Sequence, residues 1–159
     1  MPGRQLKLFE DETPGECVFC SIAQGKVESV TVYSDPRFVV FLDRSPLFKG
    51  HLLVIPRAHV ENFDSVPPEI EGSILGVARA ASLALQRVLH CDGTFIAINN
   101  KVSQTVPHLH VHVVPRRHKD GLRGFFWPRE SYAEGEAERI GKEISDAMGS
   151  IMGGNGRKR

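Results

Sequence analysis

Three histidines alternate with apolar residues in the segment HLHVHVV, residues 108–114. Successive residues of a β-strand point to opposite faces, so His108, His110 and His112 would share one face and the residues between them would belong to the core. Histidine is uncommon in protein interiors, and we expect an exposed sheet face that carries chemistry. A neutral imidazole can attack phosphorus and form a phosphoramidate that water resolves, or it can bind a metal ion.

The two kinds of chemistry place different demands on the surrounding sequence. A metal held by all three histidines usually takes a further ligand, and the next acid after His112 is Asp120, beyond a proline and two arginines. Positive charge close to the histidines would favour attack on a phosphate, although the same residues could form a solvated loop. The basic residues that follow the segment are Arg116, Arg117, His118, Lys119 and Arg123. We therefore favour phosphate chemistry and keep the metal site as the alternative.

The histidine segment is the last of five predicted strands. Runs of β-branched and apolar residues, ended by turn residues or proline, predict strands at 30–33, 38–42, 50–56, 94–99 and 108–115. Apolar residues at helical spacing predict one long helix within 65–90. The pattern predicts an α+β fold with a mostly antiparallel sheet of about five strands, covered on one face by the long helix.

A second helix is predicted near the C-terminus. Ser131 would begin it, with Glu134 completing a capping box. Ile140, Ile144 and Met148 would form its buried stripe.

Composition sets the broad class. The chain has 159 residues, 41% hydrophobic and 25% charged, with a formal net charge of +1, as in an ordinary globular domain. This charge excludes a general polyanion-binding surface, so we expect no bulk nucleic-acid binding. We find no secretory signal and no membrane-spanning apolar run, and we expect a cytoplasmic protein whose 3 cysteines are thiols or metal ligands.

Four segments follow from these patterns. We expect a flexible N-terminal arm over 1–16, the main domain over 17–118, an extension with a helix over 119–152, and a disordered basic tail over 153–159.

The segment QTVPHLHVHVVPR closely resembles the signature of the histidine triad (HIT) family of nucleotide hydrolases and transferases. The upstream segment FVVFLDRSPLFKGHLLVIPRAHVENF is similar to the strand, aspartate, Gly-His and Pro-x-x-His segment of the same family. The resemblance covers roughly residues 17–117. It implies a HIT-like fold, a nucleotide substrate and a homodimer.

The resemblance also implies roles for single residues. His110 would attack the α-phosphorus, His112 would contact the phosphate, and His51 would support the two histidines. The implied substrate-binding residues are Asp43, for the ribose hydroxyls, and Asn99, Gln104 and Thr105, for the phosphate or the leaving group. A turn-capping role for Asp43, loop hydrogen bonds for Gln104 and Thr105, and Asn100 in place of Asn99 stay open. The apolar residues Phe19, Ile22 and Phe41 would influence the choice of base or simply belong to the core.

The chain departs from the family pattern at two places. Val102 and Ser103 stand before Gln104, where family members usually have glycine. Trp127 and Pro128 resemble a Trp-Pro pair that reaches a partner subunit in the phosphoramidase branch, but at a different spacing. All three histidines are kept, unlike in the uridylyltransferase-like branch.

A CxxC pair, Cys17 and Cys20, supplies half of a metal site. An acidic coil precedes it in place of a strand, which disfavours a thioredoxin-like redox role. Several bacterial-type family members combine a similar pair with the histidine of Pro-x-x-His and the first triad histidine to hold structural zinc. This resemblance implies His59 and His108 as the remaining ligands, with a CxxC pair that binds no metal as the alternative.

Together these features predict a nucleotide hydrolase or nucleotidyl transferase. The enzyme would act at the α-phosphate of an adenine nucleotide, either a dinucleoside polyphosphate or an adenosine phosphoramidate, through a nucleotidyl-His110 intermediate. The alternatives are a regulatory nucleotide-binding protein with little turnover, a metal-dependent enzyme that uses the three histidines as ligands, and a scaffold that acts through its C-terminal extension.

Overall fold

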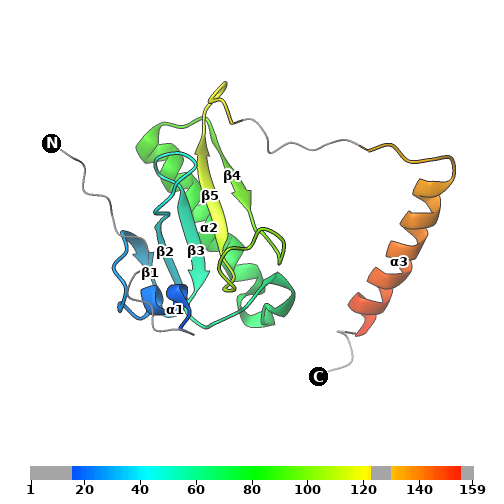
Figure 1. Ribbon diagram of the computed structural model, residues 1–159, viewed down its shortest axis with the longest axis horizontal. Helices are drawn as coiled ribbons and strands as arrows, with labels where there is room; N and C mark the ends of the chain where they lie inside the picture. The colour runs from blue at the N-terminus through cyan, green and yellow to red at the C-terminus, as the bar shows by residue number, and fades with distance from the viewer. Residues whose placement is uncertain (1–15, 123–129, 155–159) are drawn as a thin grey trace. The chain divides into compact units, whose positions relative to one another are not determined.

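The computed structural model describes residues 16–122 and 130–154 (Figure 1). Its elements in chain order are α1 (Val18–Ala23), β1 (Thr31–Ser34), β2 (Phe38–Leu42), β3 (Leu52–Pro56), a short 3-10 helix (Phe63–Ser65), α2 (Pro68–Leu89), β4 (Gly93–Ala97), β5 (Val111–Arg116) and α3 (Glu136–Gly154). No helix in these ranges has the length and apolar character needed to cross a bilayer.

The five strands form one sheet in the order β1-β2-β3-β5-β4, and all neighbours are antiparallel. β5 lies between β3 and β4, where His112 pairs with Leu53 on one side and with Ala97 on the other. The predicted α+β class, with its five-stranded antiparallel sheet and long helix, is confirmed.

Helix α2 covers one face of this sheet. Pro68 occupies its first turn, where a missing N–H costs nothing, and His90 ends it in the left-handed conformation with φ 51°. Its buried residues Ile74, Ala78, Ala81 and Leu85 recur at helical spacing and pack on β2, β3 and β5. This packing forms the larger core.

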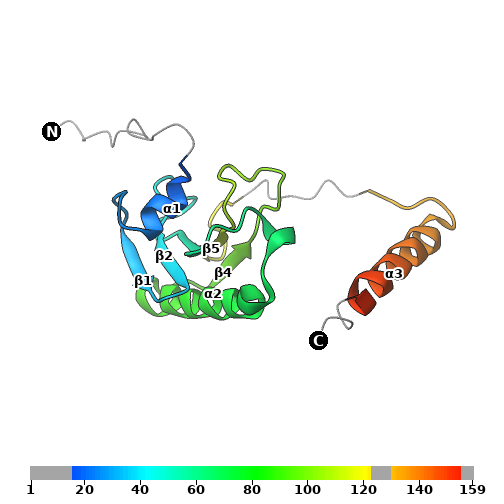
Figure 2. The same ribbon diagram turned by 90° about the horizontal axis from the view of Figure 1, so that it is seen from below.

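The opposite face is covered over β2 and β3 by α1, so the expectation of a sheet covered on one face is wrong (Figure 2). Val18, Phe19 and Ile22 of α1 pack on apolar residues of the two strands. The strand residues in this second core are Val39, Phe41, Leu53 and Ile55. The strands alternate between the two cores, with even-numbered β2 residues towards α2 and odd-numbered ones towards α1.

Helix α3 belongs to a second compact unit that begins at Gly121. It starts five residues later than expected, at Glu136, whose Oε2 accepts from the backbone N–H of Ala133 at 2.8 Å. Ile144 and Met148 are 55% and 57% exposed, so this unit by itself does not bury the predicted stripe. The amphipathic pattern correctly indicated a helix.

Several expectations lie outside the described residues. They concern the arm over 1–16 except for Glu16, the tail from 155 onward, and Arg123, Trp127 and Pro128.

Candidate functional site

Two of the triad histidines, His108 and His110, lie in the interior and His112 is half-buried, so the expectation of an exposed face is wrong. His108 is 0% and His110 4% exposed, because α1 lies over this part of the sheet. β5 begins at Val111, so His108 and His110 come just before the regular strand. The intervening residues behave as predicted, since Leu109 and Val111 belong to the core beneath α2.

The tautomer of His110 follows from its hydrogen bond. Its Nδ1 lies 2.7 Å from the main-chain carbonyl of His108. A carbonyl oxygen only accepts, so Nδ1 carries the hydrogen and Nε2 presents a lone pair. Burial lowers the pKa of His110, which keeps the ring neutral. His110 is therefore in the form that a nucleophile requires.

A chain of hydrogen bonds also fixes the tautomers of His51 and His112. The backbone N–H of Leu47 donates to His51 Nδ1 at 3.2 Å, so the ring hydrogen of His51 lies on Nε2. This Nε2 is 2.9 Å from His112 Nδ1 and donates to it. Nε2 of His112 must then carry a hydrogen, and it is buried without a partner among the described residues. A buried N–H without a partner is a ready donor for a ligand oxygen.

Burial also sets the charge of these two rings. It lowers the pKa of His112 to about 4, with the neighbouring His110 and His51 acting in the same direction. The pKa of His51 is lowered by burial as well, against the opposing effect of Asp43. Both rings are therefore neutral near pH 7.

Asp43 serves a turn and faces the site at the same time. Its Oδ1 accepts from the backbone N–H of Ser45 at 2.8 Å, the turn-capping role that the sequence left open. Its Oδ2 lies 3.7 Å from His51 Nδ1. The carboxylate thus fixes the turn that precedes β3 and also lines a cavity beside His110 and His112.

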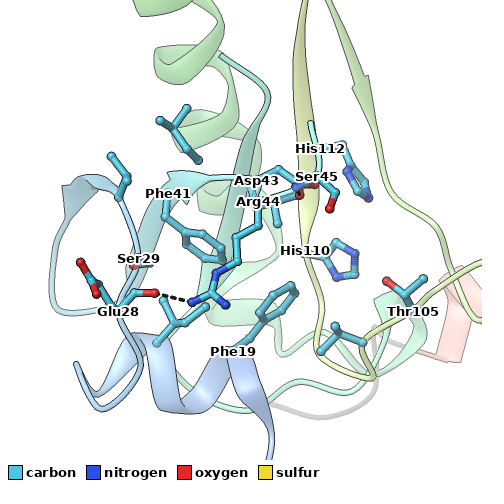
Figure 3. A pocket seen from close by; sticks show the side chains of 15 residues that line it. Phe19, Glu28, Ser29, Phe41, Asp43, Arg44, Ser45, Thr105, His110 and His112 are labelled. Carbon is cyan, nitrogen blue, oxygen red and sulfur yellow. Dashed lines mark hydrogen bonds between the residues drawn. The ribbon is translucent and has the colours of Figure 1, made fainter. Parts of the chain in front are cut away.

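A cavity of about 640 Å³ opens beside the histidines (Figure 3). His110, His112, Asp43 and Thr105 line it, together with Ser45. Its apolar lining comprises Phe19, Ile22, Val30, Phe41, Leu42, Leu53 and Val106. The Phe19 ring stands edge-to-face on His110, with centroids 5.2 Å apart. A volume of this size suits a small organic ligand such as a nucleotide.

The structure does not bring Gln104 and Asn99 to this cavity. The Nε2 of Gln104 donates to the carbonyl of Glu61 at 2.6 Å, and its Oε1 accepts from the backbone N–H of Lys101 at 3.0 Å. Gln104 thus makes the loop hydrogen bonds that were its alternative role. Asn100 holds the 3-10 helix by accepting from the backbone N–H of Phe63 at 3.0 Å.

The backbone before Gln104 keeps a conformation that suits glycine. Ser103 has φ 60°, in the left-handed region that non-glycine residues rarely adopt. Ser103 therefore adopts a backbone conformation that glycine would adopt without strain.

The basic residues after the triad that the structure describes, Arg116, Arg117, His118 and Lys119, do not line the cavity. Arg116 is ion-paired with Asp120, with Nη2 2.9 Å from Oδ1. Arg117 donates to the carbonyl of His90 at 2.8 Å and so satisfies an end of α2. Arg116 lies six residues beyond His110, about 20 Å along a strand. The expected role in phosphate chemistry is wrong for Arg116 and Arg117, which the structure assigns to holding the fold.

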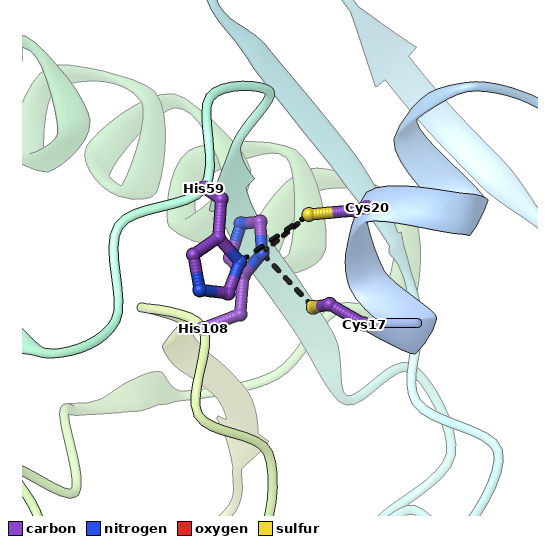
Figure 4. Close-up of side chains that lie close together, drawn as sticks. All are labelled: Cys17, Cys20, His59 and His108. Atoms are coloured by element: carbon purple, nitrogen blue, oxygen red, sulfur yellow. Dashed lines mark hydrogen bonds between the residues drawn. The ribbon is translucent and has the colours of Figure 1, made fainter. Parts of the chain in front are cut away.

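The four predicted metal ligands meet in one cluster (Figure 4). Their ligand atoms, Sγ of Cys17 and Cys20 and Nδ1 of His59 and His108, all lie within 4.8 Å of one another. Sγ of Cys20 is 3.3 Å from His59 Nδ1 and 3.5 Å from His108 Nδ1. Tetrahedral zinc with its usual bond lengths would separate such sulfur and nitrogen atoms by roughly 3.6 Å.

The protonation of the cluster also suits a cation. The Nε2 of His108 donates to the carbonyl of Pro56 at 2.9 Å, so its Nδ1 presents a lone pair to the sulfur atoms. Burial and the neighbouring Cys17 raise the pKa of the Cys20 thiol to about 11. A bound metal ion would reverse this effect by stabilising thiolates. The residues fit a tetrahedral metal with two sulfur and two nitrogen ligands.

A metal held by all three triad histidines has no support in the part of the chain that the structure describes. Two clusters there could hold an ion, and neither contains His110. The second cluster consists of Asp43, His51 and His112, two of which already share the hydrogen bond described above.

Comparison with known proteins agrees with this geometry. Residues 24–119 match the model of the HIT domain. This chain belongs to the HIT family. A HIT family protein from Bacillus anthracis is 32% identical, with a TM-score of 0.75 over 85% of this chain and 99% of that chain. A Zn-bound histidine triad family protein from Mycobacterium smegmatis is 36% identical, with a TM-score of 0.65 over 85% and 96% of the two chains.

One relative has a stated activity. An adenylylsulfatase from Arabidopsis thaliana is 28% identical over 147 residues, which make up 91% of this chain and 72% of the relative.

The motifs of the HIT family did not indicate the far end of the cavity. Glu28, Ser29 and Arg44 line it there and were missed from sequence. The only available signal was the position of Arg44 directly after Asp43.

Proposed function

We propose that this HIT family protein is a hydrolase or nucleotidyl transferase acting at the α-phosphate of an adenine nucleotide. The observation that carries this proposal is the assigned tautomer of His110, whose Nε2 lone pair is held beside the cavity by the bond from Nδ1 to His108. The adenylylsulfatase relative supports an adenine nucleotide as the substrate class. Substrates would be a dinucleoside polyphosphate or an adenosine phosphoramidate.

In the first step, His110 Nε2 attacks the α-phosphorus. A bond from nitrogen to phosphorus forms, and the bond to the leaving group breaks with its electron pair passing to that group. The ring then carries a positive charge, which the His108 carbonyl stabilises through the hydrogen on Nδ1. Water attacks the phosphorus in the second step, releases the nucleoside monophosphate and restores neutral His110.

The neighbouring groups bind and orient the substrate. His112 would donate its buried Nε2–H to a phosphate oxygen, and His51 would fix the tautomer that makes this possible. Thr105 would donate to the phosphate or the leaving group, and Asp43 would accept from the ribose hydroxyls. We propose that Gln104 acts indirectly, by shaping the loop that presents Thr105. A phosphate contact by Asn99 stays a prediction.

The metal cluster would supply structural stability. We propose zinc, because the ligands are two thiols and two imidazoles and because a Zn-bound relative exists. Bound there, the ion would cross-link the start of α1, the loop after β3 and the triad segment, which is a structural role.

A homodimer is the proposed assembly. β4 is an edge strand, and its Ile96 is 44% exposed. Leu83 and Val88 of α2 are 49% and 71% exposed. Apolar residues exposed along a strand edge and a helix face favour pairing with a second copy.

The decisive experiment compares the wild type with His110→Ala. Each protein is incubated with adenosine phosphoramidate and with a labelled dinucleoside polyphosphate, and samples quenched in alkali are examined for nucleotide bound to protein. We expect the His110 variant to lose turnover roughly a thousandfold or more and to retain no bound label. His118→Ala is the matched control, because His118 is exposed and does not line the cavity.

The regulatory alternative has a different signature. A protein that binds AMP tightly but releases no monophosphate from either substrate would be a nucleotide-binding regulator. Turnover in the His110 variant equal to the wild type would reject the nucleophile.

A further inference from the structure

The cluster of Cys17, Cys20, His59 and His108 lies where small molecules in solution can reach it. His59 is exposed, and the two cysteines are only partly buried. The two sulfur atoms lie within 4.8 Å of each other and face the same pair of imidazoles (Figure 4). A CxxC pair one turn apart can close a disulfide, with sulfur atoms about 2 Å apart, through a modest movement of its side chains. Cys17 and Cys20 are therefore an accessible pair for thiol–disulfide exchange.

Oxidation of this pair and binding of a metal exclude each other. Zinc is held by thiolates, and a disulfide sulfur carries no negative charge. Once the pair is oxidised, only the imidazoles of His59 and His108 remain as ligands, whereas a structural zinc site needs four. Oxidised Cys17 and Cys20 would therefore release the ion.

Two contacts connect the cluster to the cavity. The first runs through His108, whose main-chain carbonyl accepts from His110 Nδ1 at 2.7 Å. The second runs through α1, which begins directly after Cys17 and carries Phe19. The Phe19 ring stands edge-to-face on both histidines, with its centroid 5.2 Å from that of His110 and 5.9 Å from that of His108. Phe19 also lines the cavity and directly precedes Cys20, so movement of that cysteine would disturb the cavity wall.

We propose that Cys17 and Cys20 form a thiol switch, in which oxidation by a low-molecular-weight disulfide releases the metal and weakens nucleotide binding beside His110. The inference rests on the metal site of the proposed function. The role is regulatory, and it differs from the thioredoxin-like catalysis that the preceding coil disfavours.

The chemistry of the switch is two successive exchanges. One cysteine sulfur attacks the small disulfide, so that a mixed disulfide forms and one small thiolate leaves. The other cysteine sulfur attacks the first, which closes the bond between Cys17 and Cys20 and releases the second small thiolate. The cysteine pair loses two electrons, the small disulfide gains them, and the two released thiolates take up protons from water. An excess of a small thiol reverses both steps.

The closed disulfide would act on the cavity through both contacts. The sulfur atoms of Cys17 and Cys20 lie 3.4 Å and 3.5 Å from His108 Nδ1, and closure draws them towards each other. His108 is fully buried, so its Nδ1 would be left without the metal in a place where water does not reach it. The start of α1 would no longer be cross-linked to the triad segment, and Phe19 would lose its fixed position on His110.

The test treats the full, zinc-loaded chain with oxidised glutathione. Zinc release is followed with a chromogenic chelator, free thiols are counted after denaturation, and the disulfide is located by mass spectrometry of peptides. Equilibrium binding of AMP and turnover of adenosine phosphoramidate are measured before oxidation, after it, and again after addition of dithiothreitol and zinc. Cys91→Ser is the control, because Cys91 is buried outside the cluster.

We expect oxidation to release one zinc ion per chain and to consume two of the 3 thiols. AMP binding should weaken roughly tenfold, the lower part of the range for disturbing the groups that support a site. Dithiothreitol with zinc should restore it, and Cys91→Ser should respond as the wild type does. Cys20→Ser cannot close the disulfide and should bind AMP more weakly than the reduced wild type before any treatment.

The outcomes separate the switch from the reaction. Zinc retained after oxidation, or AMP binding unchanged once the Cys17–Cys20 disulfide has formed, would overturn the inference and leave the proposed reaction intact. A chain that takes up no zinc would overturn it together with the metal site. Absence of turnover in the reduced, zinc-loaded protein would reject the reaction, while zinc release and AMP binding would still decide for or against the switch.

Discussion

His108 connects the cluster of cysteines and histidines to His110, the proposed nucleophile. Its ring presents Nδ1 to Cys17 at 3.4 Å, and its main-chain carbonyl accepts from His110 Nδ1 at 2.7 Å. The same residue therefore contributes its side chain to the proposed metal site and fixes the tautomer of His110 with its backbone carbonyl. Any movement of His108 changes both sites.

Removing the metal is expected to destabilise the domain. We predict one zinc ion per chain, and its loss in Cys20→Ser, because that variant removes one of four ligands. The free energy of unfolding should fall in the variant and in the wild type after chelation. Metal content by mass spectrometry and urea unfolding measure the two effects.

Cys91→Ser is the control for this prediction, since Cys91 lies outside the cluster. Equal metal content in Cys20→Ser and the wild type would refute the site.

Acid is expected to weaken the fold through His112. Its pKa is about 4 in the folded protein and about 6.5 in an unfolded chain. Between these values the unfolded state binds the proton and the folded state does not. The contribution of neutral His112 to the free energy of unfolding is therefore fully present above pH 6.5. It falls by up to about 1.4 kcal/mol per pH unit as the pH drops towards 4.

Unfolding by urea between pH 4 and 7 tests this dependence. The curve for His112→Gln should be flatter than that of the wild type, whereas the curve for His118→Gln should match the wild type because His118 is exposed. Parallel curves for the wild type and His112→Gln would show that His112 is not the group responsible.

Ser103→Gly is predicted to stabilise the protein. Serine at φ 60° is strained, and glycine relieves this strain at a smaller cost in unfolded-chain entropy. We expect a gain of up to about 1 kcal/mol in the free energy of unfolding. Ser103→Ala removes the same hydroxyl but keeps the Cβ atom, so it should give no gain. A loss of stability in the glycine variant would contradict the strain argument.

Gly50→Ala is predicted to be destabilising. Gly50 has φ 101°, and a Cβ atom there would lie 2.5 Å from Leu89 Cδ1. Backbone strain should cost about 1–2 kcal/mol, and the contact adds the smaller cost of moving the end of the half-buried Leu89 side chain. Gly25→Ala has a similar backbone problem at φ 74° but nothing within 4 Å, and should cost about 1 kcal/mol. Thermal unfolding of the two variants separates the steric cost of the added Cβ atom from the cost of backbone strain. Equal losses of stability in the two variants would show that the contact with Leu89 contributes nothing.

The sequence predicted the elements whose signals are local. Alternation and prolines located the strands, and helical spacing located α2, because both patterns arise from the geometry of single elements. The family motifs located His110, His112 and Asp43, which line one cavity, and His51, which is hydrogen-bonded to His112.

The predictions from sequence that were wrong concern contacts between segments far apart in the chain. A six-residue helix carries too short a pattern to show that α1 would bury the triad. The side-chain bonds of Gln104 to Glu61, and of Arg117 to the end of α2, join residues 43 and 27 positions apart. A motif gives a residue type and a position, but such partners become visible only in three dimensions.

The wall of the cavity is formed in part by a helix that has little intrinsic stability. α1 has six residues, too few to persist as a helix by itself, so its order comes from docking on β2 and β3 and on the cysteine cluster. Its amide hydrogens should therefore exchange faster than those of α2, and nucleotide stacked beside Phe19 should slow them. Hydrogen exchange with and without AMP measures both rates. The protein would thus gain local order when it binds its ligand, and part of the binding free energy would be spent on completing its own fold.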